Sequence, residues 1–271
     1  MISILPIMPV KTLSIALFAL VFVAVSCGGN GYATLRVFAA SSLTEAFKDI
    51  SLAFEAANSD VVVELDFSGS QWLRSQLEFG AKADVFASAD PIQTDLLVAA
   101  SLVSGMPTDF ASNALVVVAM ANGPVREISD LGKPGIRVVL GQQNVPVGSY
   151  SRQVLENLSL DAELGLGGGF KDDVLANLAS AEPNVNYAFQ KVVLGEVDAG
   201  IVYETNVTNY SGIRSNDVIF ISIPVDANVS TRYSIALLGG ASDPGLAQEF
   251  VGFVLSEDGQ RILGNHGFRS P

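Results

Sequence analysis

The sequence predicts an α/β protein folded as two lobes, each with a mostly parallel sheet flanked by helices. Three observations predict this class. Strand-like and helix-like segments alternate from about residue 33 onward, 49% of the 271 residues are hydrophobic, and the chain has no internal repeat or coiled-coil pattern. A chain of this length and composition can bury a sizeable core and has room for one large or two ordinary domains.

The first series of elements is typical of a βαβαβ unit. Three short segments rich in β-branched and aromatic residues are expected to be strands. The two segments between them carry apolar residues at helical spacing. In chain order these five segments are 34–40, 44–58, 61–67, 71–80 and 84–89.

Two further series follow the first. The second contains the expected strands and helices 114–120, 136–141, 151–158, 185–196 and 199–203, and the third contains 219–225, 232–238, 244–256 and 258–267. The apolar strands at 114–120 and 232–238 are expected to cross between the lobes, leaving a cleft between them. The glycine-rich segment 163–170 lacks the order of a dinucleotide-binding loop and is expected to be an insertion loop.

These series give the expected domain boundaries. Residues 34–113 and 232–271 form the predicted lobe 1, and residues 114–231 form the predicted lobe 2. In this arrangement the chain leaves the first lobe once and returns to it at the end.

The N-terminal segment has the pattern of a secretory leader. Residues 1–26 carry one charge, Lys11, followed by an apolar run of thirteen residues, 13–25, which is short for a membrane span. The protein's only cysteine, Cys27, comes directly afterwards and resembles the acylated residue of bacterial lipoproteins. We therefore expect a signal peptide at 1–26 and a lipid-anchor linker at 27–33. In the alternative, the leader is an ordinary secretory one and Cys27 is incidental.

Composition disfavours several other functions. Acidic residues exceed basic ones by 13, so a basic face for nucleic acid has little support, and a single cysteine allows no internal disulfide. A Ser/His/Asp triad would need His266, the only histidine. A lipid-anchored surface hydrolase remains an alternative that depends on His266 lining the cleft. A structural or adhesive lipoprotein is another, which would have no closed cleft.

Two predicted helix starts of the first lobe carry serine. In 41-SSLTEAF-47, Ser42 and Glu45 fit a capping box, so Ser42 is expected to cap the helix that follows. In 67-FSGSQWL-73, Ser70 is expected at the N-cap, and the glycine before it allows close backbone approach.

Two more helix starts belong to the second lobe. In 145-VPVGSYSRQVL-155, the free amides of the helix are expected near Val147 and Gly148. In 181-AEPNVNYAF-189, Pro183 suits the first helical position, which would leave the amides of Asn184 and Val185 free. Unpaired helix N-termini can bind anions, although any one of them can simply be a capped helix.

Four sequence stretches together resemble the periplasmic molybdate-binding proteins of ABC importers. The likeness runs in one order over nearly all of residues 34 to 268. It is carried by 37-VFAASSLTEAF-47, 67-FSGSQWLRSQLEFGAKADVFASAD-90, 145-VPVGSYSRQVL-155 and 195-GEVDAGIVYETN-206.

The resemblance implies a two-lobed receptor, without catalysis or a cofactor, that closes on a tetrahedral oxyanion. It assigns the ligand hydroxyls of the first lobe to Ser42 and Ser70. It assigns the backbone donors of the second lobe to Val147 and Val185, and a tyrosine hydroxyl to Tyr203. Any bound metal would be held only as this oxyanion. The family commonly has alanine at the position of Val147, so the size of the pocket is open.

The resemblance also implies the ligand and the partners. We expect an extracytoplasmic, lipid-anchored monomer that captures molybdate, and also tungstate, and delivers it to an ABC permease in the membrane. The same receptor class could instead bind tungstate, sulfate or thiosulfate. Uncharged hydrogen-bond donors favour fully deprotonated oxyanions, because hydrogen phosphate carries a proton that would lack an acceptor.

Overall fold

The computed structural model describes residues 32–208, 210 and 217–271. The predicted signal peptide and Cys27 lie outside this part of the chain. Residues 32–271 form one compact unit. No helix in the described part of the chain is long and apolar enough to cross a membrane.

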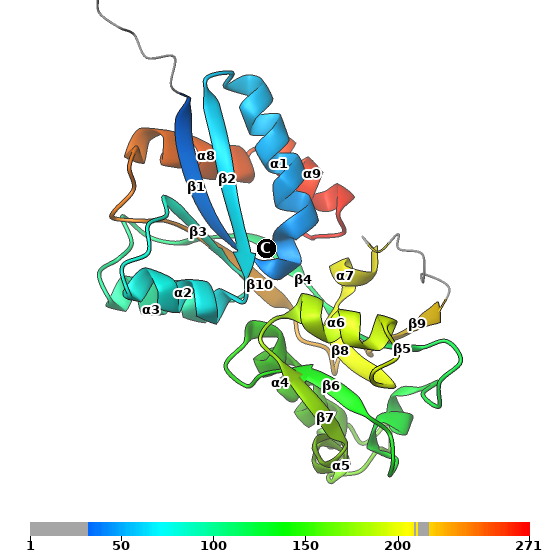
Figure 1. Ribbon diagram of the computed structural model, residues 1–271. Coiled ribbons are helices and arrows are strands. Elements are labelled where there is room, and N and C mark those ends of the chain that lie inside the picture. Colours follow the sequence, from blue (N-terminus) through cyan, green and yellow to red (C-terminus); the bar gives the residue numbers. More distant parts are fainter. Residues whose placement is uncertain (1–31, 209, 211–216) are drawn as a thin grey trace, which may run out of the picture. The chain divides into compact units, whose positions relative to one another are not determined.

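The first of two five-stranded sheets has the strand order β2-β1-β3-β10-β4 (Figure 1). Strand β1 pairs in parallel with β2 and β3, while β10 is antiparallel to both β3 and β4. The strands are β1 (Ala33–Ala40), β2 (Val61–Ser68), β3 (Val85–Ser88), β4 (Thr108–Asn113) and β10 (Thr231–Leu237).

Helices cover both faces of this sheet, because successive side chains of a strand point to opposite faces. On β1, Val37 packs in the same cluster as Phe47 of α1 and Phe250 of α8, whose rings lie 6.3 Å apart. Its neighbour Phe38 packs with Leu73 of α2 and other residues on the opposite face. The helices are α1 (Thr44–Ala57), α2 (Ser70–Glu78), α3 (Pro91–Ala99), α8 (Pro244–Leu255) and α9 (Glu257–Asn265).

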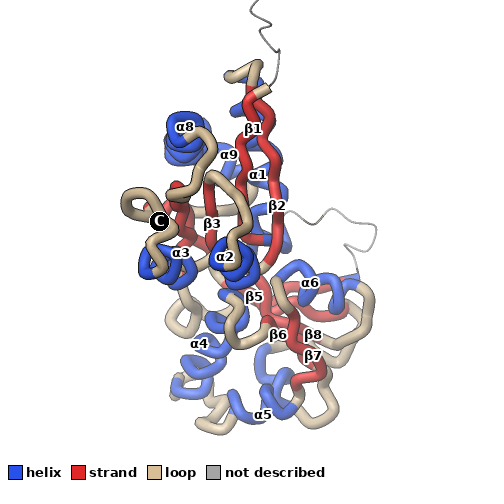
Figure 2. The backbone as a smooth tube through the Cα atoms, turned by 60° about the vertical axis from the view of Figure 1, so that its left-hand side comes forward, coloured by secondary structure: helices blue, strands red, loops and turns tan. Residues whose placement is uncertain are grey.

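The second sheet has the order β7-β6-β8-β5-β9, and helices α4 and α6 both contact β6 and β8 (Figure 2). Strand β6 is parallel to β7 and β8, and β5 is antiparallel to β8 and β9. The strands are β5 (Leu115–Met120), β6 (Val138–Gly141), β7 (Leu178–Glu182), β8 (Ala199–Tyr203) and β9 (Val218–Ser222). The helices are α4 (Pro146–Leu160), α5 (Phe170–Ala176), α6 (Val185–Val193) and α7 (Glu204–Thr208).

The chain crosses between the two sheets twice. Strand β4 of the first sheet runs through Ala114 into β5 of the second, and the chain returns from β9 to β10. The prediction of a two-lobed α/β fold with crossing strands is confirmed. Five helices and strands were not predicted: α3, β4, α5, β7 and α7. Helix α3 escaped the periodicity analysis because its apolar Ile92 and Leu96 are exposed, so that it has no one-sided apolar stripe.

Candidate functional site

A small cavity lies where strands of both sheets end and helices begin. Its volume is about 10 Å³, roughly the space for one water molecule and too small for a sugar or a peptide. Ligands of α/β sheets commonly bind at the carboxyl ends of the strands. All lining residues are uncharged: Ala40, Ser41, Ser42, Ser68, Gly69, Ser70, Ala89, Val145, Pro146, Val147, Asn184, Val185 and Tyr203. The structure thus brings the five predicted site residues together in one cavity wall.

Ser42 lines the cavity, but it does not cap a helix. It lies in a short 3-10 turn, η1 (Ser41–Leu43), and α1 begins after it with Leu43 at the N-cap and no capping side chain. The predicted capping box is therefore wrong. The turn places Thr44, whose hydroxyl donates to the Ser41 carbonyl at 2.7 Å, at the start of α1. The oxygen of Ser42 contacts the hydroxyl of Tyr233 at 3.0 Å instead.

Ser70 is the first residue of α2, and the N-cap is Gly69 rather than Ser70 as predicted. The Ser70 hydroxyl oxygen accepts a hydrogen bond from the backbone N–H of Ala89 at 3.0 Å. Gly69 allows the two lobes to approach closely, because a Cβ atom there would lie 2.3 Å from the carbonyl oxygen of Pro183 in the second lobe.

The second lobe contributes the first turns of two helices. Helix α4 begins at Pro146, so Val147 is its second residue, and α6 begins at Val185. Asn184 is the N-cap of α6, and its side chain accepts from the Tyr187 N–H at 3.1 Å. Pro183 therefore precedes the cap, contrary to the predicted first helical position. The first amides of a helix have no partner within it, so the N–H groups of Val147 and Val185 are donors without intrahelical acceptors.

Tyr203 ends β8, and its side chain is 1% exposed. Its hydroxyl is buried and makes no hydrogen bond of good geometry in the described part of the chain, although the Tyr233 hydroxyl lies nearby. Burial raises the pKa of the Tyr203 hydroxyl well above its ordinary value. The group therefore stays protonated near neutral pH and can donate a hydrogen bond.

Helix N-termini contribute partial positive charge at the cavity, and no basic side chain lines it. Helix N-termini carry a partial positive charge, and α2, α4 and α6 all begin at the cavity. The guanidinium of Arg152 lies behind the start of α4, where it donates to the carbonyl oxygens of Gly141 at 3.0 Å and Gly148 at 2.8 Å. Arg152 does not line the cavity.

Two side-chain hydrogen bonds connect the lobes beside the cavity. The side-chain amide of Gln71 donates to the Pro183 carbonyl at 2.9 Å, and that of Asn186 donates to the Ser41 carbonyl at 2.9 Å. Each bond joins a residue of one lobe to a residue of the other, so the structure represents the lobes in contact around the cavity.

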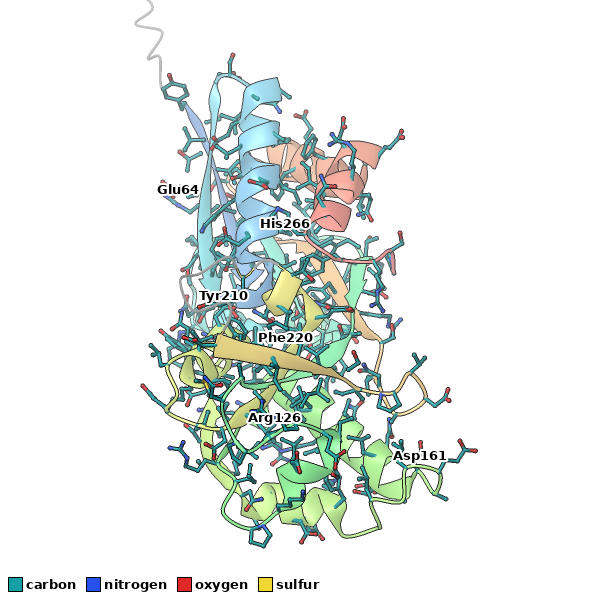
Figure 3. The ribbon with its side chains drawn as sticks, turned by 90° about the vertical axis from the view of Figure 1, so that its right-hand side faces the viewer. Glu64, Arg126, Asp161, Tyr210, Phe220 and His266 are labelled. Atoms are coloured by element: carbon teal, nitrogen blue, oxygen red, sulfur yellow. The ribbon has the colours of Figure 1, made fainter. Side chains whose placement is uncertain are left out.

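His266 lies away from the cavity. It follows α9, and its Nε2 atom is 2.8 Å from a carboxylate oxygen of Asp49 (Figure 3). His266 is not among the residues that line the cavity, so a triad at this site has no histidine. Among the described residues, no group of three or more His, Cys, Asp and Glu side chains could hold a metal ion.

Two polar residues behind the cavity were not predicted. Tyr233 is fully buried in β10 and reaches Ser42, and Asn113 at the end of β4 reaches Tyr233. In the sequence, Tyr233 is one aromatic residue of an expected crossing strand, and Asn113 directly precedes the other. The contact of Asn113 with Tyr233 depends on the register of β10 against β4, which the sequence pattern does not specify.

Residues 35–269 match the family described as bacterial extracellular solute-binding protein. Among characterised relatives, the molybdate-binding protein ModA of Mycobacterium tuberculosis is 37% identical over 260 residues, covering 91% of this chain and 93% of the relative. A putative ABC transporter substrate-binding lipoprotein of Bacillus subtilis is 26% identical and covers 87% of this chain and 86% of its own length.

Solved structures share the fold. The substrate-binding domain of a putative molybdenum ABC transporter from Clostridium difficile is 26% identical with a TM-score of 0.64, covering 88% of this chain and 99% of the other. The sulfate-binding protein SubI of Mycobacterium tuberculosis is 19% identical with a TM-score of 0.76, covering 88% and 87%, and its likeness concerns the fold alone. The match over nearly the whole described chain, together with the two-lobed fold, shows that this protein belongs to the bacterial extracellular solute-binding protein family.

Proposed function

We propose that this protein is the receptor of an ABC importer that captures molybdate, and also tungstate, in the cavity between its lobes. The chain is a solute-binding receptor and not an enzyme, as its family membership shows.

One observation carries the choice of an oxyanion. The cavity combines helix N-termini, two serine hydroxyls and a buried tyrosine hydroxyl without a partner, and no charged side chain lines it. A buried donor that makes no hydrogen bond costs stability, and an anion in the cavity would remove this cost. In the proposed complex, Ser42, Ser70 and Tyr203 donate through hydroxyls, while Val147 and Val185 donate through their backbone N–H groups.

The same donors favour molybdate over phosphate. Molybdate, tungstate and sulfate are fully deprotonated near pH 7 and accept hydrogen bonds on every oxygen. Hydrogen phosphate carries one proton, and in a cavity of donors this proton would remain without an acceptor at a cost of roughly 1–3 kcal/mol. Sulfate has no such proton and must be discriminated by its smaller size. The ModA relative, a molybdate-binding protein 37% identical to this chain, supports molybdate as the first choice.

The two sheets support the proposed lobes. Strands β1 to β4 and β10 form the first sheet and β5 to β9 form the second, in agreement with boundaries near residues 113 and 231. We propose that closure of these lobes traps the ion. We also propose that the receptor acts as a monomer.

The lipid anchor is a separate part of the proposal. It rests on Cys27 in the sequence, and the name of the Bacillus subtilis relative, a lipoprotein, supports it. An anchor at Cys27 would keep the receptor at the outer face of the cytoplasmic membrane, close to the permease that receives the ion.

Thermal unfolding with a panel of oxyanions tests the proposed ligand. Molybdate and tungstate should raise the unfolding temperature, because a ligand that binds only the folded state stabilises it by mass action. Phosphate at the same concentration and ionic strength should leave it unchanged, and sulfate tests the contribution of size. Stabilisation by phosphate equal to that by molybdate would contradict the donor-only cavity, and no shift with any oxyanion would contradict the proposed function.

A further inference from the structure

We propose that Tyr233 and Asn113 are positioning residues that turn the hydroxyl hydrogen of Ser42 toward the cavity and thereby help the receptor reject protonated oxyanions. This inference rests on the proposed function, since it concerns selectivity at the same cavity. It is carried by a chain of three hydrogen-bonding side chains whose direction the structure determines.

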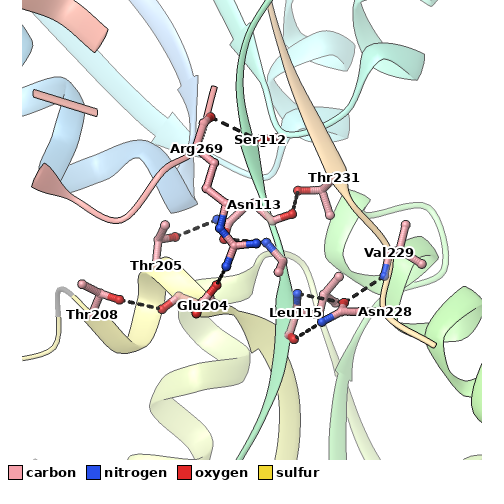
Figure 4. Close-up of polar contacts among 11 residues, drawn as sticks. Ser112, Asn113, Leu115, Glu204, Thr205, Thr208, Asn228, Val229, Thr231 and Arg269 are labelled. Carbon is pink, nitrogen blue, oxygen red and sulfur yellow. Dashed lines mark hydrogen bonds and ion pairs between the residues drawn. The ribbon is translucent and has the colours of Figure 1, made fainter. Parts of the chain in front are cut away.

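The first step is the orientation of the Asn113 side-chain amide. Its oxygen lies 2.9 Å from the backbone N–H of Ala114, and a backbone N–H can only donate. The amide nitrogen is therefore on the other side, 2.9 Å from the hydroxyl oxygen of Thr205 and 3.4 Å from that of Tyr233. Figure 4 shows Asn113 between Thr205 and Thr231, whose hydroxyl donates to the Asn113 backbone carbonyl at 3.2 Å.

The second step is the direction of the Tyr233 hydroxyl. The amide nitrogen of Asn113 is only a donor, so the oxygen of Tyr233 accepts from it. The hydrogen of Tyr233 is then available to the oxygen of Ser42 at 3.0 Å. Burial raises the pKa of the Tyr233 hydroxyl above its ordinary value, so it keeps this hydrogen at neutral pH.

The third step concerns Ser42 itself. Because its oxygen accepts from Tyr233, its own hydrogen points away from Tyr233, and Ser42 lines the cavity. Ser70 is held in the same way, since its oxygen accepts from the Ala89 N–H at 3.0 Å. Both serines therefore present hydrogens to the cavity. The backbone donor behind Ser70 cannot be removed by a side-chain substitution, whereas the donor behind Ser42 can.

Two substitutions change the direction of the chain without changing the cavity wall. Tyr233→Phe removes the hydroxyl and frees the Ser42 hydroxyl to rotate. Asn113→Asp replaces the only donor of the Asn113 side chain by an acceptor of nearly the same shape. Tyr233 would then donate to the carboxylate, and Ser42 would donate to Tyr233 and turn its oxygen toward the ligand.

The test is a calorimetric titration of the full mature protein with molybdate, sulfate and phosphate at pH 8. Sulfate and hydrogen phosphate are both compact tetrahedral dianions, and only hydrogen phosphate carries a proton, so their affinity ratio separates protonation from size. For Tyr233→Phe, we expect molybdate affinity to fall about two- to tenfold, as for one ordinary hydrogen bond. The ratio of sulfate to phosphate affinity should fall by a similar factor, and Asn113→Asp should lower it further. Tyr187→Phe, which removes an exposed hydroxyl outside the cavity, is the matched control and should change neither quantity.

The outcomes separate this inference from the proposed function. If Tyr233→Phe weakens all three anions equally, Tyr233 has a structural role only and the inference is wrong. If Asn113→Asp does not fold, Tyr233→Phe alone still decides. If the unaltered protein binds no oxyanion, the proposed function fails and the inference fails with it. If it binds molybdate and the sulfate-to-phosphate ratio is unchanged in both variants, only the inference fails.

Discussion

Replacing Tyr203 by phenylalanine should change the stability and the affinity of the protein in opposite directions. The substitution removes one oxygen from a side chain that is 1% exposed and whose hydroxyl has no partner in the described structure. The ring remains, so its contact with the ring of Tyr233, at 5.9 Å between centroids, is retained.

The two effects can be estimated from the same hydroxyl. In the empty protein, an unsatisfied buried donor is destabilising, and its removal should raise the free energy of unfolding by about 1 kcal/mol. In the complex, the hydroxyl would donate to an anion, and a hydrogen bond to a charged group contributes roughly 1.5–3 kcal/mol. Tyr203→Phe should therefore weaken molybdate binding about tenfold to 150-fold.

Chemical denaturation without ligand and calorimetric titration with molybdate measure the two quantities on one preparation. Ser42→Ala is the comparison, because it removes a hydroxyl that already has a partner in Tyr233 and should lower both affinity and stability. If Ser42→Ala weakens molybdate binding and Tyr203→Phe leaves it unchanged, Tyr203 is structural and its assignment as a ligand is wrong.

Three further predictions concern closure, pH and the anchor. Gly69→Ala places a methyl group 2.3 Å from the Pro183 carbonyl oxygen of the other lobe, so the affinity for molybdate should fall about five- to 150-fold in calorimetry. The protein should still fold, because the φ of −64° and ψ of 134° at Gly69 suit alanine. Unchanged affinity would show that the lobes need not approach so closely. The Arg137 guanidinium lowers the pKa of Asp198, so this carboxylate stabilises the fold above the ordinary Asp pKa, and the contribution is lost as the pH falls through the lowered value. Denaturation measurements on Asp198→Asn should therefore show a weaker loss of stability below about pH 4 than the unaltered protein shows. A pH dependence parallel to that of the unaltered protein would refute this. Cys27→Ser should accumulate as membrane-embedded precursor in cell fractionation, and its release as a soluble mature form would refute the anchor.

The sequence predicted the two-lobed fold because its strands and helices alternate with clear periodicity. Serine and proline in the sequence also marked, to within a few residues, the turn η1 and the helices α2, α4 and α6 that begin at the cavity, although neither Ser42 nor Ser70 is an N-cap. The details of the caps were less predictable. Ser42 is not an N-cap because a 3-10 turn precedes α1. The N-cap of α6 is Asn184, whereas the prediction had placed Pro183 inside the helix as its first residue.

The assignment of the five site residues came from resemblance to a family, and their role as ligands stays a prediction. That they line one cavity is a property of tertiary structure, since Tyr203 ends one strand and the other four lie in helices or a turn that follow four other strands. The hydrogen-bond chain from Asn113 through Tyr233 was beyond sequence analysis. It requires the register of antiparallel strands distant in sequence and the orientation of a side-chain amide, neither of which leaves a local pattern.

The central claim is that the cavity binds a fully deprotonated tetrahedral oxyanion through uncharged donors. Calorimetric titration of the mature protein with molybdate, in the absence and presence of excess phosphate at pH 8, tests it most directly. We predict saturable binding of one molybdate per chain, with an affinity that phosphate does not reduce. Binding that phosphate displaces as effectively as molybdate itself, or the absence of any binding, would contradict the claim.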